Sequence, residues 1–438
     1  MCFREKGIMA TYYIDANAGD NANDGLSENT AVADMDVLSI EPGDTVLFKR
    51  GSFIRKKIKT VEGKPGKPIK YAAYGEGEMP TFCGSINLTD ERFWVEESKN
   101  IWYFAAPGCE EAANLIFNKS DLCAALKWSK EELCDQGDFF DNCFSTSLDE
   151  NRDLSGHKIY LYSNGNPAKY YSDIECAVCN YRVLADNGHD VTFEGLRFLN
   201  SAIHGIAGLG ICRNLRVIGC SFEHIGGAVW DKKQKIRFGN GVEAWNIGEN
   251  IEVRGCWFCD IYDSATTQQG GELCEQAKNF IIRDNVFIKC GMAAYEQRDR
   301  IPESAEFCNN ICVDAGDGFS KLGEEMPRYS EIWPEPMGHH IFLWRIDKDN
   351  SGHLEIKNNT FYNAPYGAAI YSIISKDAEN VCEVENNTYY TENTELMNRW
   401  GGVNYKTFDE YKSLEKGCKY EKVDIEKLLA DWKKEHLG

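Results

Sequence analysis

A six-residue pattern recurs through the second half of the chain and limits the folds that the chain can adopt. It consists of an apolar residue, a variable residue, then Gly, Asp or Asn, two further residues, and a residue that is usually aromatic. We call the third position the anchor, and the anchors are Gly195, Gly219, Gly255, Asp284, Asn309, Asn358 and Asn386. Units of about 22–29 residues with short β-type runs and no helical apolar period predict a solenoid of strands.

Paired asparagines at several anchors have a physical reason in such a fold. The pairs are 309/310, 358/359 and 386/387. Asn tolerates left-handed backbone at a tight bend, and stacked Asn side chains can hydrogen-bond from coil to coil. The Leu consensus of a leucine-rich repeat is absent, as are the Trp-Asp and Gly-His signatures of a propeller. The sequence therefore predicts an all-β fold, a single right-handed parallel β-helix with loop insertions and a C-terminal helical cap.

The ends and one internal stretch depart from the repeat. Residues 1–10 lack the apolar segment of a secretory signal, and we expect them to be a leader. The β-helix is predicted over 11–395, with an insertion around 109–157 that carries a helical stretch from Ser120 to Asp135. The charged, helix-prone tail at 396–438 is expected to cap the last coil, whose open strand edges would otherwise invite pairing.

Composition excludes several partners and predicts the state of the thiols. Lys plus Arg is 48 and Asp plus Glu is 69, a net charge of −21 that repels nucleic acid. No apolar run is long enough to cross a membrane. Eighteen cysteines without a secretory signal favour free thiols and a cytoplasmic location. The Cys-x-x-Cys pairs 176/179 and 256/259 have no partner pair, so we interpret them as buried thiols and expect no metal site.

Several segments also resemble carbohydrate-active β-helix proteins. In the first part of the chain these are Tyr12–Asp20, Asn23–Gly25, Pro42–Val46, Gly66–Ile69 and Tyr74–Gly77, and in the centre Gly239–Trp245, Asp260–Asp263 and Ala294–Glu296. That superfamily includes polysaccharide lyases, glycoside hydrolases of the β-xylosidase and α-fucosidase types, uronate epimerases and phage tailspike depolymerases. The resemblance implies an oligosaccharide or polysaccharide substrate and leaves the reaction open.

Three carboxylates are the candidate catalytic residues. Aligning the segments 241–245, 265–269 and 294–298 places Glu243 and Glu296 in one column two coils apart, with Thr267 or Gln268 between them. Two coils separate Cα atoms by about 9–10 Å, near the ~6.5–9.5 Å carboxyl spacing of an inverting glycosidase. Asp263 lies in the turn of the intermediate coil, and a pair that included it would approach the ~5 Å spacing of a retaining enzyme.

Substrate-binding residues are expected beside these acids. Aromatic rings could stack on sugars, and amide or guanidinium groups could donate to hydroxyls; the candidates are Trp245, Tyr262, Tyr295, Gln268, Gln269 and Arg298. Loops at 228–239 and 319–339 are expected to wall the site. Strand alternation lets one residue of the His339-His340 doublet face the site, and we favour His340.

A glycoside hydrolase acting on an oligosaccharide, without a cofactor, accounts for the paired carboxylates. The first alternative is a polysaccharide lyase or uronate epimerase, with Arg298, Lys321 or His340 as the base and Ca²⁺ bound by the acidic cluster. The second alternative is a non-catalytic glycan-binding protein. The oligomeric state stays open.

Overall fold

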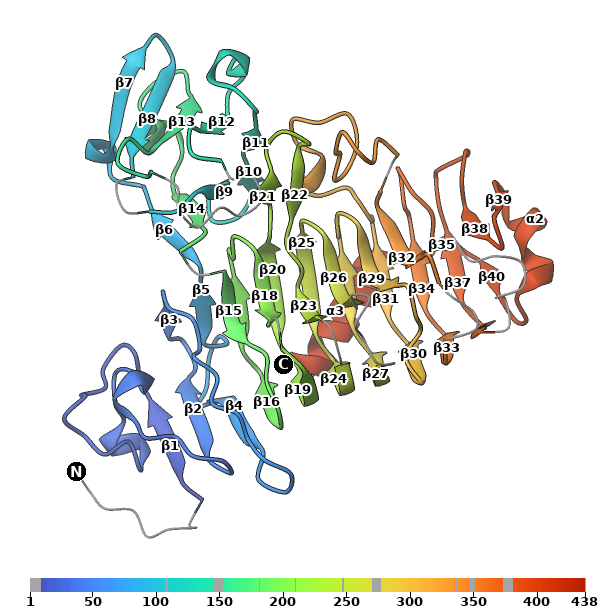
Figure 1. Ribbon diagram of the computed structural model, residues 1–438, viewed down its shortest axis with the longest axis horizontal. Coiled ribbons are helices and arrows are strands. Elements are labelled where there is room, and N and C mark those ends of the chain that lie inside the picture. The colour runs from blue at the N-terminus through green and yellow to red at the C-terminus, as the bar shows by residue number, and fades with distance from the viewer. Residues whose placement is uncertain are drawn as a thin grey trace.

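The computed structural model describes residues 9–106, 109–144, 153–180, 182–208, 210–245, 248–269, 277–335, 337–346, 351–372 and 381–437. These residues are nearly all in strands and loops, and three long sheets run the length of the molecule (Figure 1). The predicted leader lies mostly outside the described residues. So do residues 145–152 of the predicted insertion.

We name the three long sheets A, B and C. Sheet A contains β1 (Thr11–Ile14), β2 (Thr45–Lys49), β4 (Ile69–Tyr74), β16 (Val191–Glu194), β19 (Cys212–Ile218), β24 (Gly248–Arg254), β27 (Lys278–Arg283), β30 (Ser304–Cys308), β33 (His353–Lys357) and β36 (Cys382–Glu385). Sheet B contains β3 (Phe53–Ile54), β5 (Thr81–Cys83), β17 (Arg197–Leu199), β20 (Ser221–Ile225), β25 (Trp257–Ile261), β28 (Val286–Ile288), β31 (Ile311–Val313), β34 (Thr360–Tyr362), β37 (Thr388–Tyr390) and β40 (Lys419–Tyr420). Sheet C contains β15 (Val183–Asp186), β18 (His204–Ala207), β23 (Val242–Trp245), β26 (Ser264–Gln269), β29 (Ala293–Arg298), β32 (His339–Trp344), β35 (Ile370–Ser372), β38 (Asn398–Trp400) and β39 (Val403–Tyr405).

From β16 onward the chain visits the sheets in the order A, B, C and then begins the next coil. Each strand pairs in parallel with the strand of the same sheet one coil later, as β24 does with β27 and β25 with β28. The pair β38–β39, at the end of sheet C, is antiparallel. Long parallel sheets visited in rotation are consistent with a β-helix, as the repeat predicts.

The anchors lie at the bends between sheets A and B. All seven have left-handed backbone, with φ between 57° and 65°. Gly255, for example, follows the last residue of β24 and precedes β25. Gly, Asn and Asp adopt this conformation at the lowest cost, so the repeat marks the points where every coil must turn.

The second Asn of each pair forms a buried ladder along the helix axis. Asn285 Nδ2 donates to Asn310 Oδ1 (3.1 Å), Asn310 to Asn359 (3.2 Å) and Asn359 to Asn387 (2.9 Å). Asn387 donates to the buried Glu415 carboxylate, which ends the ladder (2.9 Å). The predicted stacking of asparagines is confirmed, and Asn285 joins it after the Asp284 anchor.

The two asparagines of one pair should differ in their effect on stability. Replacing Asn359 by Ala should lower the free energy of unfolding by about 1–3 kcal/mol, because buried ladder partners on both sides lose their hydrogen bonds. Replacing the neighbouring anchor Asn358 by Gly keeps the left-handed backbone and should cost far less. Urea unfolding of both variants measures the difference. Equal losses of unfolding free energy in the two variants would mean that the hydrogen-bonded ladder does not stabilise the fold more than the left-handed bend does.

Aromatic rings fill the interior along sheet B. Phe198, Phe222, Phe258 and Phe287 stack on one another with ring centroids 4.7–5.0 Å apart. Each of these rings comes from a different, successive coil. The apolar face of one coil is therefore buried only when the next coil is stacked on it. The coils therefore form one continuous core from Ile14 to Tyr411.

The chain leaves the coils between sheets B and C and forms two smaller sheets with a separate apolar core. One contains β6 (Ser85–Asn87), β9 (Ala112–Phe117), β10 (Leu122–Cys123) and β14 (Ile174–Val178); the other contains β7 (Trp94–Ser98), β8 (Ile101–Ala105), β11 (Ala125–Leu126), β12 (Asp138–Asp141) and β13 (Lys158–Tyr162). The helix expected from Ser120 to Asp135 is wrong. That stretch pairs as β10 and β11 and then forms one 3₁₀ turn, because Ala124 and Leu126 bury alternate side chains in this core.

Helices are short and few among the described residues. The α-helices are α1 (Pro167–Tyr170), α2 (Phe408–Tyr411) and α3 (Ile425–His436), and the 3₁₀ helices are Glu28–Thr30, Met35–Val37, Glu91–Phe93, Lys130–Glu132, Phe319–Lys321 and Lys412–Leu414. A two-stranded hairpin of β21 (Ala228–Asp231) and β22 (Ile236–Phe238) rises from one coil. None of these described helices has the length and apolar character needed to span a membrane.

The C-terminal tail divides into two parts, which corrects the expected cap. β39, α2 and β40 lie at the end of the coils, where β40 extends sheet B (Figure 1). α3 instead lies along the outer face of sheet B in the middle of the molecule. Its Trp432 contacts Trp257 (ring centroids 5.9 Å apart) and donates a hydrogen bond to the Asp284 carbonyl (2.9 Å). The apolar stripe of α3 finds apolar partners there, on β25, β28 and β31.

No disulfide joins any two cysteines within the described residues. Cys2 and Cys274 lie outside those residues. Nine of the sixteen described cysteines are buried, including Cys220 and Cys256. For these nine, burial agrees with the predicted role as small apolar side chains.

Candidate active site

The outer face of sheet C brings two of the predicted carboxylates into one column. Glu243 on β23 lies opposite Thr267 on β26, and Thr267 lies opposite Glu296 on β29. On the next strand the column continues with Phe342. The alignment of the three segments is therefore correct, and the residue between the acids is Thr267.

Glu296 is fully buried within a set of donors. Its Oε2 accepts hydrogen bonds from Ser264 Oγ (2.9 Å) and Gln269 Nε2 (3.3 Å). Its Oε1 accepts a hydrogen bond from Arg298 Nε. The predicted residues Gln269 and Arg298 thus contact a carboxylate of the column directly.

The pKa of Glu296 is raised above its ordinary value. Burial is the largest cause, because it disfavours the charged carboxylate, and the nearby negative charge of Asp263 acts in the same direction. The cations Arg298 and Arg328 oppose the shift without cancelling it. This carboxyl is held towards its protonated form.

Glu243 has the opposite electrostatic environment. Burial raises its pKa, but the field and hydrogen bonding of His204, a hydrogen bond from Asn240 and the charge of Arg298 together lower it below the ordinary value. His204 Nδ1 lies 3.0 Å from Glu243 Oε2. Two carboxyls in one column thus have pKa values shifted in opposite directions.

Asp263 is engaged in an ion pair rather than free to approach the column. Arg328 Nε and Nη2 lie 2.8 Å and 3.2 Å from its two carboxylate oxygens, a bidentate contact. Both side chains are largely buried. Asp263 acts on Glu296 through its charge.

Tyr295 and Gln268 face the interior, which corrects their assignment to substrate binding. Tyr295 is fully buried and stacks on Phe307, with ring centroids 5.8 Å apart. Gln268 Oε1 accepts a hydrogen bond from Gln297 Nε2 (2.8 Å) inside the coils. Side chains alternate along a strand, so residues beside the outward-facing Glu296 and Thr267 must point inward.

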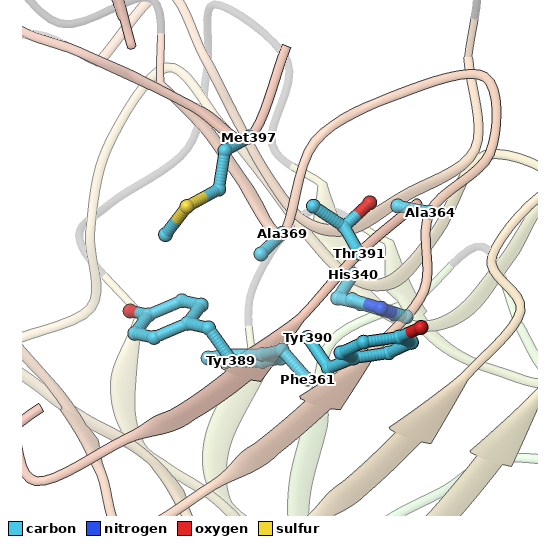
Figure 2. A pocket seen from close by; sticks show the side chains of 8 residues that line it. All are labelled: His340, Phe361, Ala364, Ala369, Tyr389, Tyr390, Thr391 and Met397. Carbon is cyan, nitrogen blue, oxygen red and sulfur yellow. The ribbon is translucent and has the colours of Figure 1, made fainter. Parts of the chain in front are cut away.

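His340 also faces the interior. Its ring stacks on Phe361 (centroids 5.6 Å apart) and lines a small pocket with core residues such as Tyr389 and Met397 (Figure 2). Burial lowers the pKa of His340 to about 3. His339 faces outward and stacks on Tyr371 (4.3 Å). The side chains of the His339-His340 doublet do alternate, as predicted, but the outward-facing residue is His339 and the choice of His340 is wrong.

Tyr262 has no exposed surface and is not available to a sugar. It packs beneath Arg237, whose guanidinium carbon lies 4.4 Å from the ring centre, and beside Phe319 (5.5 Å). These two neighbours come from the β21–β22 hairpin and the loop that begins with the 3₁₀ helix Phe319–Lys321. Among the predicted platforms, Trp245 keeps an exposed ring, with 37% of its surface accessible.

Two contact residues of this site were missed by sequence reasoning. His204 is the first residue of β18, one coil before Glu243. Because Ile206 pairs with Val242, extending the segment alignment back by one coil places Ala207, not His204, level with Glu243, so the repeat does not identify His204. Arg328 lies in a long loop outside the repeat, and no sequence pattern placed it beside Asp263. Within the described residues, the groups with metal-ligand geometry lie away from this column.

Comparisons with known proteins give a limited local match and a match of fold. No protein-family model matches the chain. A segment is 38% identical over 77 residues to a lacto-N-biosidase of Bifidobacterium longum subsp. longum, covering 16% of this chain and 5% of that protein.

Two solved structures are similar over most of this chain. One is a complex of XylC with xylose (TM-score 0.56, 12% identity, 87% of this chain and 62% of that one). The other is a GH136 lacto-N-biosidase from Eubacterium ramulus (TM-score 0.47, 14% identity, 94% of this chain and 66% of that one). The chain spans 62% and 66% of the length of these two solved chains and 5% of the curated lacto-N-biosidase. The likeness to XylC shows a shared fold.

Proposed function

We propose that this protein is a glycoside hydrolase that cleaves an oligosaccharide, with Glu296 as general acid and Glu243 as general base. The observation that carries the proposal is the column of two buried carboxyls whose pKa values are shifted apart. The local similarity to a lacto-N-biosidase and the shared fold with a protein solved with xylose support a sugar substrate. We also propose that the coils wind right-handed.

In the proposed hydrolysis each carboxyl carries out one proton transfer. In this proposal Glu296 is protonated when substrate binds and gives its proton to the oxygen of the leaving sugar. Glu243, ionised beside His204, accepts a proton from the water that attacks the anomeric carbon. Two strand spacings separate the acids by about 9.6 Å at Cα, which favours an inverting reaction. Asp263 is held in an ion pair by Arg328, and the role we propose for it is to raise the pKa of Glu296 by its negative charge.

A substrate screen tests the proposal. The purified protein is incubated with aryl glycosides and with short neutral and uronate-containing glycans, and the products are identified by mass and by NMR of the anomeric proton. We expect hydrolysis with inversion. An unsaturated uronate product would select the lyase alternative, and glycan binding without turnover would select the non-catalytic one.

Trp245 should contribute to substrate binding rather than to the chemical step. Replacing it by Ala should raise KM by about two- to tenfold, equivalent to about 0.5–1.5 kcal/mol for a ring contact, with kcat little changed. The matched control is Tyr420→Ala, which removes another exposed ring on β40. Steady-state kinetics on the confirmed substrate measures both. An unchanged KM in Trp245→Ala would place the sugar elsewhere.

A further inference from the structure

The two smaller sheets hold a polar group that the proposed reaction does not use. Asp141 is the last residue of β12, Cys143 follows two residues later, and His157 directly precedes β13. β12 and β13 pair antiparallel, with Asp141 opposite Ile159, so both ends of the connecting segment lie close together. One ligand atom from each of Asp141, Cys143 and His157 lies within 4.8 Å of the others.

The group borders a strongly apolar environment. The side chains of Asp141 and His157 are completely buried, and Cys143 is half-buried. Phe139, Phe140 and Phe144 of the same segment belong to the surrounding core. Polar and charged groups in such a place are costly unless every atom is paired or ligates a cation.

Both ring nitrogens of His157 face oxygen atoms. Its Nδ1 lies 2.9 Å from the Cys109 carbonyl oxygen, and its Nε2 lies 2.8 Å from Asp141 Oδ2. Both neighbours are acceptors, and the Asp141 carboxylate already accepts N–H groups from Ala112 and Cys143 (both 2.7 Å). A neutral imidazole has a single N–H. An imidazolium, with an N–H on each ring nitrogen, satisfies both contacts as an ion pair with Asp141, and a cation shared by Nε2 and Oδ2 would satisfy the second contact as well.

We propose that Asp141, Cys143 and His157 form a zinc site that links the end of β12 to the start of β13. A thiolate, an imidazole nitrogen and a carboxylate oxygen are a donor set that Zn²⁺ takes readily. The Nδ1–H bond to the Cys109 carbonyl would fix the tautomer whose Nε2 lone pair can ligate, with zinc replacing the direct contact between Nε2 and Asp141. Binding releases the thiol proton, and any proton on Nε2, to solvent, and water fills the fourth position.

Two other groups with metal-ligand geometry are less suited. Cys134, Asp135 and Asp138 form a group in which two members are exposed. His353, Glu355 and Glu383 lie on the outer surface of sheet A, and Lys357 already pairs with both glutamates (3.2 Å and 2.7 Å). The first of these groups provides a matched control, because it contains a cysteine and lies in the same part of the fold.

Cobalt(II) is the probe for the test. The full-length protein is stripped with a chelator under reducing conditions and titrated with Co²⁺. Wild-type protein should bind one equivalent, with a thiolate-to-cobalt charge-transfer band and the ligand-field bands of a tetrahedral site. Cys143→Ser should lose the charge-transfer band, and His157→Gln should lose tight binding. Cys134→Ser should keep both signals.

Zn²⁺ should displace the cobalt and raise the melting temperature of wild type and Cys134→Ser, but not of Cys143→Ser. This readout covers the case in which His157→Gln fails to fold. Absence of a charge-transfer band in wild type would overturn the zinc site. Loss of the band in Cys134→Ser with retention in Cys143→Ser would also overturn it, and would assign the metal to the Cys134 group.

Discussion

Replacing Glu296 by Gln should lower kcat on an unactivated oligosaccharide by about 10²–10⁴-fold, the usual contribution of general acid–base catalysis. Glutamine keeps the shape of the side chain, and its carbonyl oxygen still accepts from Ser264, 2.9 Å away in wild type. The amide has no acidic proton for the leaving oxygen. The variant should therefore fold and bind substrate with little change in KM.

An activated substrate separates loss of the acid from general damage. An aryl glycoside with an acidic phenol leaves without protonation, so Glu296→Gln should be much less impaired on it. Glu306→Gln is the matched control, since Glu306 pairs with Arg283 on the outer face of sheet A (2.6 Å). Equal losses on activated and unactivated substrates would show that Glu296 is not the acid.

The repeat explains why much of the fold could be predicted. Left-handed backbone restricts the anchors to Gly, Asn and Asp, and that restriction is visible in one sequence. Each anchor marks the start of a new strand, so Glu243 and Glu296 could be aligned without a structure, with Thr267 or Gln268 between them, and the structure selects Thr267. The column of outward-facing side chains on sheet C therefore follows from the same repeat that sets the coils.

The wrong predictions concern residues to which the repeat was not applied and segments that lie outside the repeat. Alternation from Glu296 would have placed Tyr295 inside, but its ring suggested a sugar platform. Contacts between distant parts of the chain have no local signal: Arg328 meets Asp263 from a loop, and α3 returns to the middle of sheet B. The helix expected over residues 120–135 rested on a weak local preference, and tertiary pairing as β10 and β11 overrides it.

Replacing Glu243 by Gln should lower kcat/KM by about 10²–10⁴-fold and change the pH profile in a specific way. In wild type, activity requires Glu243 ionised and Glu296 protonated. It should fall on the acidic side as Glu243, with its lowered pKa, becomes protonated. It should fall on the alkaline side as Glu296, with its raised pKa, ionises.

Each variant should therefore lose one limb of the profile and keep the other. Glu243→Gln should retain the alkaline limb alone, and Glu296→Gln the acidic limb alone. The control Glu249→Gln, which breaks an exposed pair with Arg213 on sheet A (3.0 Å), should keep both limbs. An acidic limb that persists in Glu243→Gln would assign the base to another group. Asp263→Asn would then be the next variant to measure, because Asp263 is the carboxylate whose charge acts on Glu296.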